Sequence, residues 1–210
     1  MTKPMILGGS VSSGLDGTSF IEPLAEKYSV TKKVIREAYP GFEGSVILGY
    51  KSFTSKVQSA SVVIALDLFY WDQFNCRLPN WNEENSKAIA TLFQKTVKQG
   101  IPLVVGNLPR KQAPFDKVAH ENPCADSINL KLKTLCDQSP TKCLMVENAE
   151  IATKVNEYFV PVLAALKPEE RSLFARAKIT RDGIHPRSEA YRVIADIVDE
   201  LLVNSTLQCK

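Results

Sequence analysis

Three residues that could carry out acyl transfer together lie near the two ends of the chain. Ser10 follows an apolar run, residues 4–7, which has the length of a buried strand. The glycine pair at residues 8–9 lets the chain leave that strand in a tight turn, which would expose the serine hydroxyl. Asp182 lies three residues before His185 in a loop near the other end. Serine, histidine and aspartate are the groups that nucleophilic acyl transfer requires.

Each of these residues also has an ordinary structural interpretation. A serine after glycine often begins a helix, so Ser10 could be an N-cap. His185 could be a loop histidine before a proline, and Asp182 could be a turn residue. We favour the catalytic interpretation because the three residues occur together, each beside a predicted strand or helix.

The apolar runs predict an α/β protein. Several of them are apolar on both faces, as strands of a parallel sheet are when helices cover both sides, and strands and helical patterns alternate about five times. Strands are expected at residues 4–7, 45–50, 61–67, 101–107 and 143–147. Helices are expected at residues 18–28, 30–37, 82–99, 125–136, 150–159, 168–177 and 188–202, with a polar connection or helix at 51–59 and an irregular loop at 110–123.

Polar or glycine residues follow several of the predicted strands. Ser10, Asp67 and Asn107 come at or after strand ends, as does Gly49, and the loop of His185 leads into the last helix. In parallel sheets, ligands bind beyond the carboxyl ends of the strands. The sequence therefore predicts a site at that edge.

Composition sets broader limits. A chain of 210 residues with 44% apolar and 23% charged residues is ordinary for a globular protein, and we expect one domain over residues 1–210. The net charge of +3 comes from basic residues scattered among acidic ones, which does not favour a nucleic-acid partner. No run reaches the roughly 20 apolar residues of a transmembrane helix, and the first strand leaves no room for a signal peptide.

The five cysteines lack the spacing of a zinc site, and the chain has two histidines, so we expect no metal. Cys136 and Cys143 bracket a polar loop that a disulfide could close, and Cys76 could pair with Cys124 across two loops. Free cysteines are the equal alternative. If the disulfides form, a periplasmic or secreted protein with its signal removed is slightly favoured over a cytoplasmic one.

Two stretches resemble conserved blocks of the SGNH or GDSL hydrolases, a family of esterases, lipases, thioesterases and carbohydrate acetyl-esterases. Residues 7–14 (Leu-Gly-Gly-Ser-Val-Ser-Ser-Gly) resemble the first block, and residues 182–186 (Asp-Gly-Ile-His-Pro) with the helix that follows resemble the last. The resemblance implies a three-layer, flavodoxin-like α/β/α fold with a five-stranded parallel sheet. It also implies a Ser10 nucleophile, a His185 general base and an Asp182 that orients the imidazole, with no cofactor.

The chain departs from the family pattern at two positions. Gly9 stands where the family has the aspartate before the serine. Asp67 falls where the family has an asparagine that donates to the oxyanion hole, alongside Ser10 and a glycine that we assign to Gly49. An ionised carboxylate repels an oxyanion, and losing one donor costs about 3 kcal/mol in the transition state.

Four explanations of the Asp67 position stay open. Burial could keep Asp67 protonated, Asn107 or Asn75 could replace it as donor, or the enzyme could be weak or inactive. Alternatively, Asp67 is structural and caps the aromatic loop that follows it.

The expected substrate is a small-molecule or lipid-like carboxylic ester. Phe69, Tyr70 and Trp71 are possible walls of the acyl pocket. Such an aromatic cluster could equally be a core plug, that is, a group of side chains that fills the hydrophobic core at the end of the strand. The main alternative is a catalytically weak or inactive SGNH-like binding protein. A flavodoxin-like nucleotide binder is a weaker one, because the Ser10 loop is poor in glycines that could cradle phosphate.

Overall fold

The computed structural model describes residues 3–14, 19–34, 51–70, 72–109, 111–112, 120–121, 124–181, 185–204 and 207. Within them, five parallel strands form the central sheet, in the order β2-β1-β3-β4-β7. These strands are β1 (Pro4–Gly8), β2 (Thr31–Val34), β3 (Val62–Ala65), β4 (Leu103–Gly106) and β7 (Cys143–Val146).

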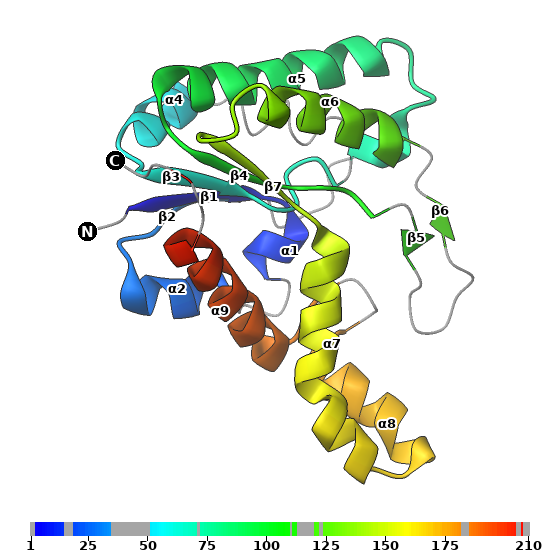
Figure 1. Ribbon diagram of the computed structural model, residues 1–210. Helices are drawn as coiled ribbons and strands as arrows, with labels where there is room; N and C mark the ends of the chain where they lie inside the picture. The colour runs from blue at the N-terminus through cyan, green and yellow to red at the C-terminus, as the bar shows by residue number, and fades with distance from the viewer. Residues whose placement is uncertain are drawn as a thin grey trace.

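Helices cover both faces of the sheet (Figure 1). One face carries α4 (Lys51–Gln58), α5 (Trp81–Lys95) and α6 (Ala125–Asp137). The other carries α1 (Ser10–Ser13), α2 (Ile21–Lys27), α7 (Asn148–Ala165) and α9 (Ser188–Asn204), with α8 (Pro168–Phe174) beside the far half of α7. The predicted three-layer α/β/α architecture is therefore confirmed.

Alternation along the strands divides the apolar side chains between the two faces. In β1, Met5 and Leu7 join the cluster under α5 and α6, while Ile6 joins the cluster under α7 and α9. All three are fully buried. Burial on both faces explains why these strands are continuously apolar in the sequence.

The second strand is not where the sequence analysis placed it. A helix was expected at residues 30–37, but residues 31–34 form β2, which pairs in parallel with β1 from Met5↔Thr31 to Gly8↔Val34. β2 lies at the edge of the sheet, where a short strand carrying lysines is tolerated, and pairing with β1 outweighs the weak helical pattern. The strand expected at residues 45–50 lies outside the described residues.

Most other elements match their predictions within a few residues. The turn expected to stop the helix at Gly100 is present: α5 is followed by a 3-10 turn, η2 (Val97–Gln99), and Gly100 adopts the left-handed conformation with φ 73°. Residues 72–75 form another 3-10 turn, η1 (Asp72–Asn75). The loop expected at 110–123 contains a short antiparallel pair, β5 (Lys111–Gln112) and β6 (His120–Glu121).

α7 is longer than the helix expected at residues 150–159. It continues through Pro161 and ends at Ala165. Pro161 lacks the N–H that would bond to the Glu157 carbonyl, but both residues are exposed, so water can satisfy that carbonyl. After α8 comes a π-helical turn, η3 (Ala175–Ile179), which leads to the His185 loop. No helix in the described ranges has the length and apolar character needed to cross a membrane.

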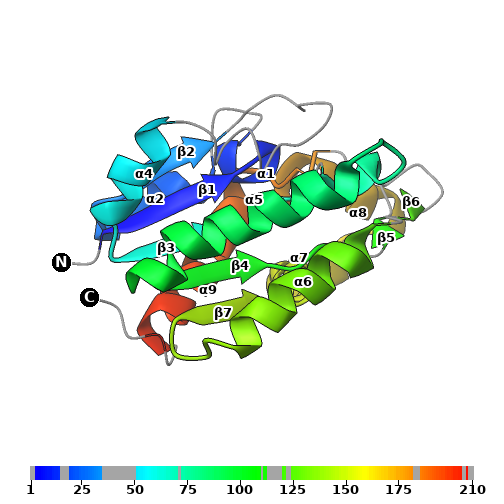
Figure 2. The ribbon, with the colours of Figure 1, turned by 90° about the horizontal axis from the view of Figure 1, so that it is seen from above.

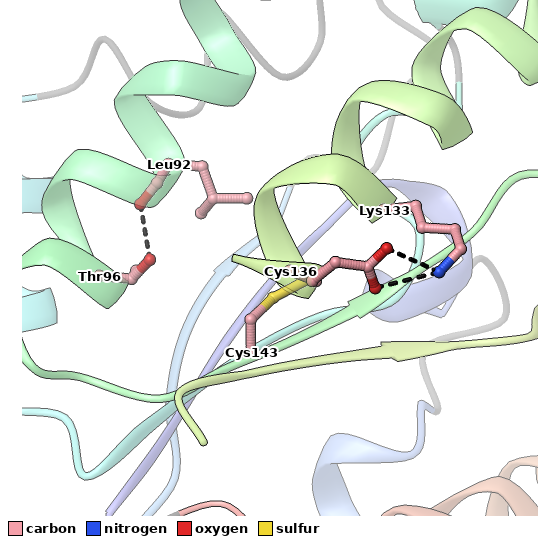
Figure 3. The surroundings of a disulfide bond; sticks show 6 residues. Leu92, Thr96, Lys133, Cys136 and Cys143 are labelled. Atoms are coloured by element: carbon pink, nitrogen blue, oxygen red, sulfur yellow. Dashed lines mark hydrogen bonds and ion pairs between the residues drawn. A yellow bond between two sulfur atoms is a disulfide. The ribbon is translucent and has the colours of Figure 1, made fainter. Parts of the chain in front are cut away.

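Both cysteine pairs considered in the sequence form disulfides. Cys136 at the end of α6 bonds to Cys143 at the start of β7, as Figure 3 shows. Cys76, just after η1, bonds to Cys124, just before α6. The second bond links the segment after β3 to the helix that precedes β7.

Candidate active site

The direction in which successive strands are added to the sheet reverses between β1 and β3. From β1 the chain goes outward to β2, then returns to the opposite side of β1 as β3 (Figure 2). The carboxyl ends of two such strands are where ligands bind in open parallel sheets. Ser10 begins α1 directly after β1, and Asp67 lies two residues after β3, so both are at this position.

Asp67 receives hydrogen bonds from the first turn of α1. The Ser12 N–H donates to its Oδ2 at 3.0 Å, the Ser12 hydroxyl donates to its Oδ1, and the backbone N–H groups of Gly9 and Val11 also donate. A Cβ at Gly8 would overlap both the Asp67 carboxylate and the Ser12 side chain, so only glycine allows this approach. The carboxylate therefore fixes the turn that carries Ser10.

Burial raises the pKa of the Asp67 carboxyl, because the side chain is 6% exposed and removal from water disfavours its charged form. The hydrogen bonds from Ser12, Gly9 and Val11 act in the opposite direction. Both carboxylate oxygens of Asp67 accept hydrogen bonds from the serine turn, which favours the structural explanation. Its backbone carbonyl contacts the aromatic loop, by accepting from the Tyr70 N–H at 3.1 Å.

Asn107 is engaged elsewhere. Its side-chain amide donates to the Glu147 carboxylate, and its Oδ1 accepts from the Asn148 N–H at 2.8 Å. The Asn148 side chain in turn donates to the carbonyls of Leu66 at 2.8 Å and Asn107 at 2.6 Å. These bonds join the ends of β3 and β4 to the start of α7, so Asn107 positions that edge, and one N–H of its amide already donates to Glu147.

His185 is held by a backbone bridge before α9. The Arg181 N–H donates to the His185 carbonyl at 2.8 Å, the Arg187 N–H donates to the Ile179 carbonyl at 2.9 Å, and Thr180 pairs with Pro186 in an antiparallel bridge. The His185 residue is 8% exposed. These contacts hold residues 185–187 against residues 179–181, at the end of η3.

A hydrogen bond joins the two predicted catalytic segments. The Tyr191 hydroxyl, on the first turns of α9, donates to the Val11 carbonyl in α1 at 2.7 Å. Tyr191 is 1% exposed and packs in the core beneath α9. The chain thus connects the backbone next to Ser10 with the helix that follows His185.

Several predicted site residues cannot be placed. Asp182, Gly49 and Trp71 lie outside the described residues, and the side chains of Ser10 and Asn75 are not described. The triad geometry and the oxyanion hole stay predictions.

The two described aromatic residues of the predicted acyl pocket are core residues. Phe69 is 1% exposed and Tyr70 is 5% exposed, and both belong to the apolar cluster between the sheet and α5. This packing favours the core-plug interpretation over a pocket wall.

A groove of about 370 Å³ lies between α2 and α9 and is lined by polar and charged residues such as Glu22, Lys27 and Arg192. Its described lining includes Ser188, the first residue of α9, but not His185. Among the residues that the structure describes, no group of three or more histidine, cysteine or acidic side chains could hold a metal ion.

Ser12, Asn148 and Tyr191 support the site but were not identified as functional from the sequence. Tyr191 lies in the helix after residues 182–186, which resemble the family's last block, and nothing in its sequence context shows that its hydroxyl reaches α1. Ser12 and Asn148 likewise act through partners 55 and 82 positions away. Such pairs become visible only in three dimensions.

No family model matches this sequence, and no curated protein matches it. Solved structures do match it along nearly the whole chain. A GDSL-like lipase from Bacteroides thetaiotaomicron shares 15% identity over 96% of this chain and 88% of its own, with a TM-score of 0.61. An acetyl xylan esterase shares 17% over 95% and 99%, with a TM-score of 0.59. The psychrotrophic esterase EstA from Pseudoalteromonas sp. shares 11% over 97% and 100%, with a TM-score of 0.55.

These matches define the class of fold. The chain has the three-layer fold of the SGNH or GDSL hydrolases, and the resemblance found in the sequence is confirmed at the level of the fold.

Proposed function

We propose that this protein is a serine hydrolase of the SGNH type that cleaves a carboxylic ester. The observation that carries the proposal is the place of two residues in this fold: Ser10 opens the helix after β1, and His185 lies in the loop before α9. The Tyr191 hydroxyl supports it by tying these two segments together. The matched solved structures include proteins named as lipase and esterase.

In the proposed mechanism, the Ser10 hydroxyl oxygen attacks the ester carbonyl carbon while His185 takes the hydroxyl proton. The tetrahedral intermediate collapses, the bond to the alcohol oxygen breaks, and His185 returns the proton to that alcohol. Water then attacks the acyl-enzyme by the same route and releases the carboxylic acid. Asp182 orients the imidazole and stabilises its charged form.

The oxyanion formed in each step would be stabilised by backbone N–H groups. The proposed donors are the N–H groups of Ser10 and Gly49, because the carboxylate of Asp67 and the amide of Asn107 already have other partners. Asp67 acts as a positioning residue: it holds the turn of α1, which carries Ser10. The Asp67 carboxylate comes from the end of β3 and accepts a hydrogen bond from the backbone of Gly9. Gly9 is the position at which the family pattern has an aspartate.

The test is hydrolysis of short and medium p-nitrophenyl esters by the wild-type protein and by Ser10→Ala and His185→Ala variants. We expect each substitution to reduce kcat by at least about a hundredfold, as removal of a nucleophile or base does. Equal rates in the wild type and Ser10→Ala would remove Ser10 from the mechanism.

The weak or inactive binding protein is the alternative, motivated by Gly9 and by the occupied side chains of Asp67 and Asn107. A serine-reactive phosphonate separates the two functions; the EstA structure is described as inhibited by monoethylphosphonate. Labelling of Ser10 that requires His185 supports the hydrolase. A folded protein that is not labelled supports the binding protein.

A further inference from the structure

The far half of α7 carries an apolar surface away from the sheet. Residues 158–165 read Tyr-Phe-Val-Pro-Val-Leu-Ala-Ala, without a charge. Tyr158, Val160 and Val162 are 64%, 56% and 45% exposed. Figure 1 shows this half of α7, with α8 beside it, extending beyond the helices that cover the sheet. We call residues 158–181 the distal hairpin.

The exposed apolar side chains lie on more than one side of α7. Tyr158 and Val162 are four residues apart and share one side of the helix, whereas Val160 lies about 200° around from both. α8 covers only part of the circumference, where Phe159 contacts Phe174 with ring centroids 6.1 Å apart. On α8 itself, Leu173 is 71% exposed.

This distribution decides between two kinds of partner. A protein surface covers one face of a helix, so it would leave either Val160 or the pair Tyr158 and Val162 in water. Lipid acyl chains can surround a projecting helix end on several sides at once. Exposed apolar surface of this kind marks a protein or membrane contact, and the arrangement around α7 favours the membrane.

The net positive charge of the distal hairpin is complementary to an anionic lipid surface. It holds five basic and two acidic residues, a net charge of +3 that equals the net charge of the whole chain. One acidic residue, Glu170, is turned back to the Lys167 N–H at 2.9 Å. Basic residues beside an apolar helix attract anionic headgroups. The basic residues are Lys167, Arg171, Arg176, Lys178 and Arg181, of which Lys178 also pairs with Glu189 of α9 at 2.6 Å.

We propose that the distal hairpin docks the protein on an anionic lipid bilayer. Tyr158, Val160 and Val162 enter the boundary between headgroups and acyl chains, and the basic residues of α8 and η3 contact the headgroups. The hairpin continues into the His185 loop through the bridge of Thr180 with Pro186, so the docked bilayer lies at the same end of the molecule as the predicted catalytic edge. Bilayer binding needs no esterase activity, so it is tested separately from the proposed function.

The experiment is co-sedimentation of the full chain with vesicles of phosphatidylcholine alone and of an equimolar mixture of phosphatidylcholine and phosphatidylglycerol. We expect binding to the mixed vesicles, weaker binding to the neutral ones, and loss of binding as salt is raised. Val160→Glu with Val162→Glu should weaken binding to the mixed vesicles at least about tenfold, because two charges would enter the apolar boundary. Leu130→Glu on α6 is the matched control, since Leu130 is 68% exposed and lies on the other helical layer.

Circular dichroism shows whether each variant is folded, and the salt dependence of wild-type binding tests the charge argument without any substitution. The proposal is overturned if the wild type binds neither vesicle, or if Leu130→Glu weakens binding as much as the double variant. If the wild type binds no vesicle but forms a dimer in solution that the double variant abolishes, the hairpin contacts a second copy of the chain instead of a bilayer.

Discussion

The Tyr191 hydroxyl donates a 2.7 Å hydrogen bond to the Val11 carbonyl, across 180 positions of sequence. Val11 follows the predicted nucleophile, and Tyr191 lies on the helix that follows the predicted base. The bond reaches the backbone of α1 from one side, while Asp67 holds the same turn from the end of β3. The short helix that carries Ser10 is therefore fixed by two elements distant in sequence.

Tyr191→Phe should lower both stability and esterase activity. The substitution leaves the Val11 carbonyl without this donor, and loss of one such hydrogen bond costs about 1 kcal/mol or somewhat more when the remaining group is buried. We expect kcat to fall, because the turn carrying Ser10 loses one of its anchors. Urea denaturation and p-nitrophenyl ester hydrolysis measure the two effects.

Tyr28→Phe is the matched control for Tyr191→Phe. The Tyr28 hydroxyl donates to the Asp199 carboxylate and so links the end of α2 to α9, and this hydrogen bond does not involve α1. This variant should lose stability while keeping kcat. An equal fall of kcat in both variants would show that the Tyr191 effect is only a general loosening of α9.

Asp67→Asn should have a larger effect than Ser12→Ala. An asparagine offers one oxygen and an NH₂ group to a pocket in which the described donors are N–H and O–H groups, so at least one donor of α1 loses its partner. We expect a loss of about 1–3 kcal/mol in the free energy of unfolding, and a lower kcat. Ser12→Ala removes a single donor and keeps the carboxylate, so its loss should be about 1 kcal/mol. If Asp67→Asn kept full stability and full activity, the positioning role would be wrong.

Asp67 and Asp199 should give opposite pH dependences of stability. Burial raises the pKa of the Asp67 carboxyl above its ordinary value of 3.8, so between that value and the folded-state pKa the native state binds more protons than the unfolded chain. Its contribution to stability is therefore largest at low pH and falls as pH rises through this interval. Hydrogen bonds from Lys27 and Tyr28 lower the pKa of the Asp199 carboxyl, so its contribution is present above 3.8 and is lost as pH falls through the folded-state pKa.

Urea unfolding of the wild type, Asp67→Asn and Asp199→Asn over a range of acidic pH checks both signs. The difference between wild type and Asp67→Asn should shrink as pH rises, and the difference between wild type and Asp199→Asn should grow. Two differences that change in the same direction would contradict the assignment for one of the carboxyl groups.

The sequence predicts most of the fold because buried parallel strands and amphipathic helices leave strong patterns. β3 is apolar on both faces, and α9 repeats apolar residues at helical spacing, so both are recognised from local sequence. β2 is not recognised, since residues 31–34 alternate too little to reveal a strand and acquire their conformation by pairing with β1. Local propensity is a weak guide wherever a neighbouring strand supplies the stabilising contacts.

The site shows the same limit more clearly. Asp67 could be identified as a departure from the family pattern, yet its sequence context says nothing about the turn of α1 that it accepts hydrogen bonds from. Phe69 and Tyr70 follow a strand as pocket residues often do, but which way each side chain points depends on the turn after β3, and they point into the core. Spacing identifies candidate residues, whereas their partners are set by packing.

The two disulfides should differ in their effect on stability. In the chain-entropy model a crosslink restricts the unfolded chain more when the closed loop is longer. Cys76 and Cys124 are 48 residues apart, and Cys136 and Cys143 are 7 apart. Replacing both cysteines of a pair by serine should therefore cost about 4 kcal/mol for the first pair and about 2.5 kcal/mol for the second. Urea denaturation under non-reducing conditions measures the two losses of stability. Adding reductant to each variant then measures the contribution of the disulfide that the variant still contains. A greater loss for the short loop would mean that the native contacts around Cys136, and not the entropy of the unfolded chain, determine the effect.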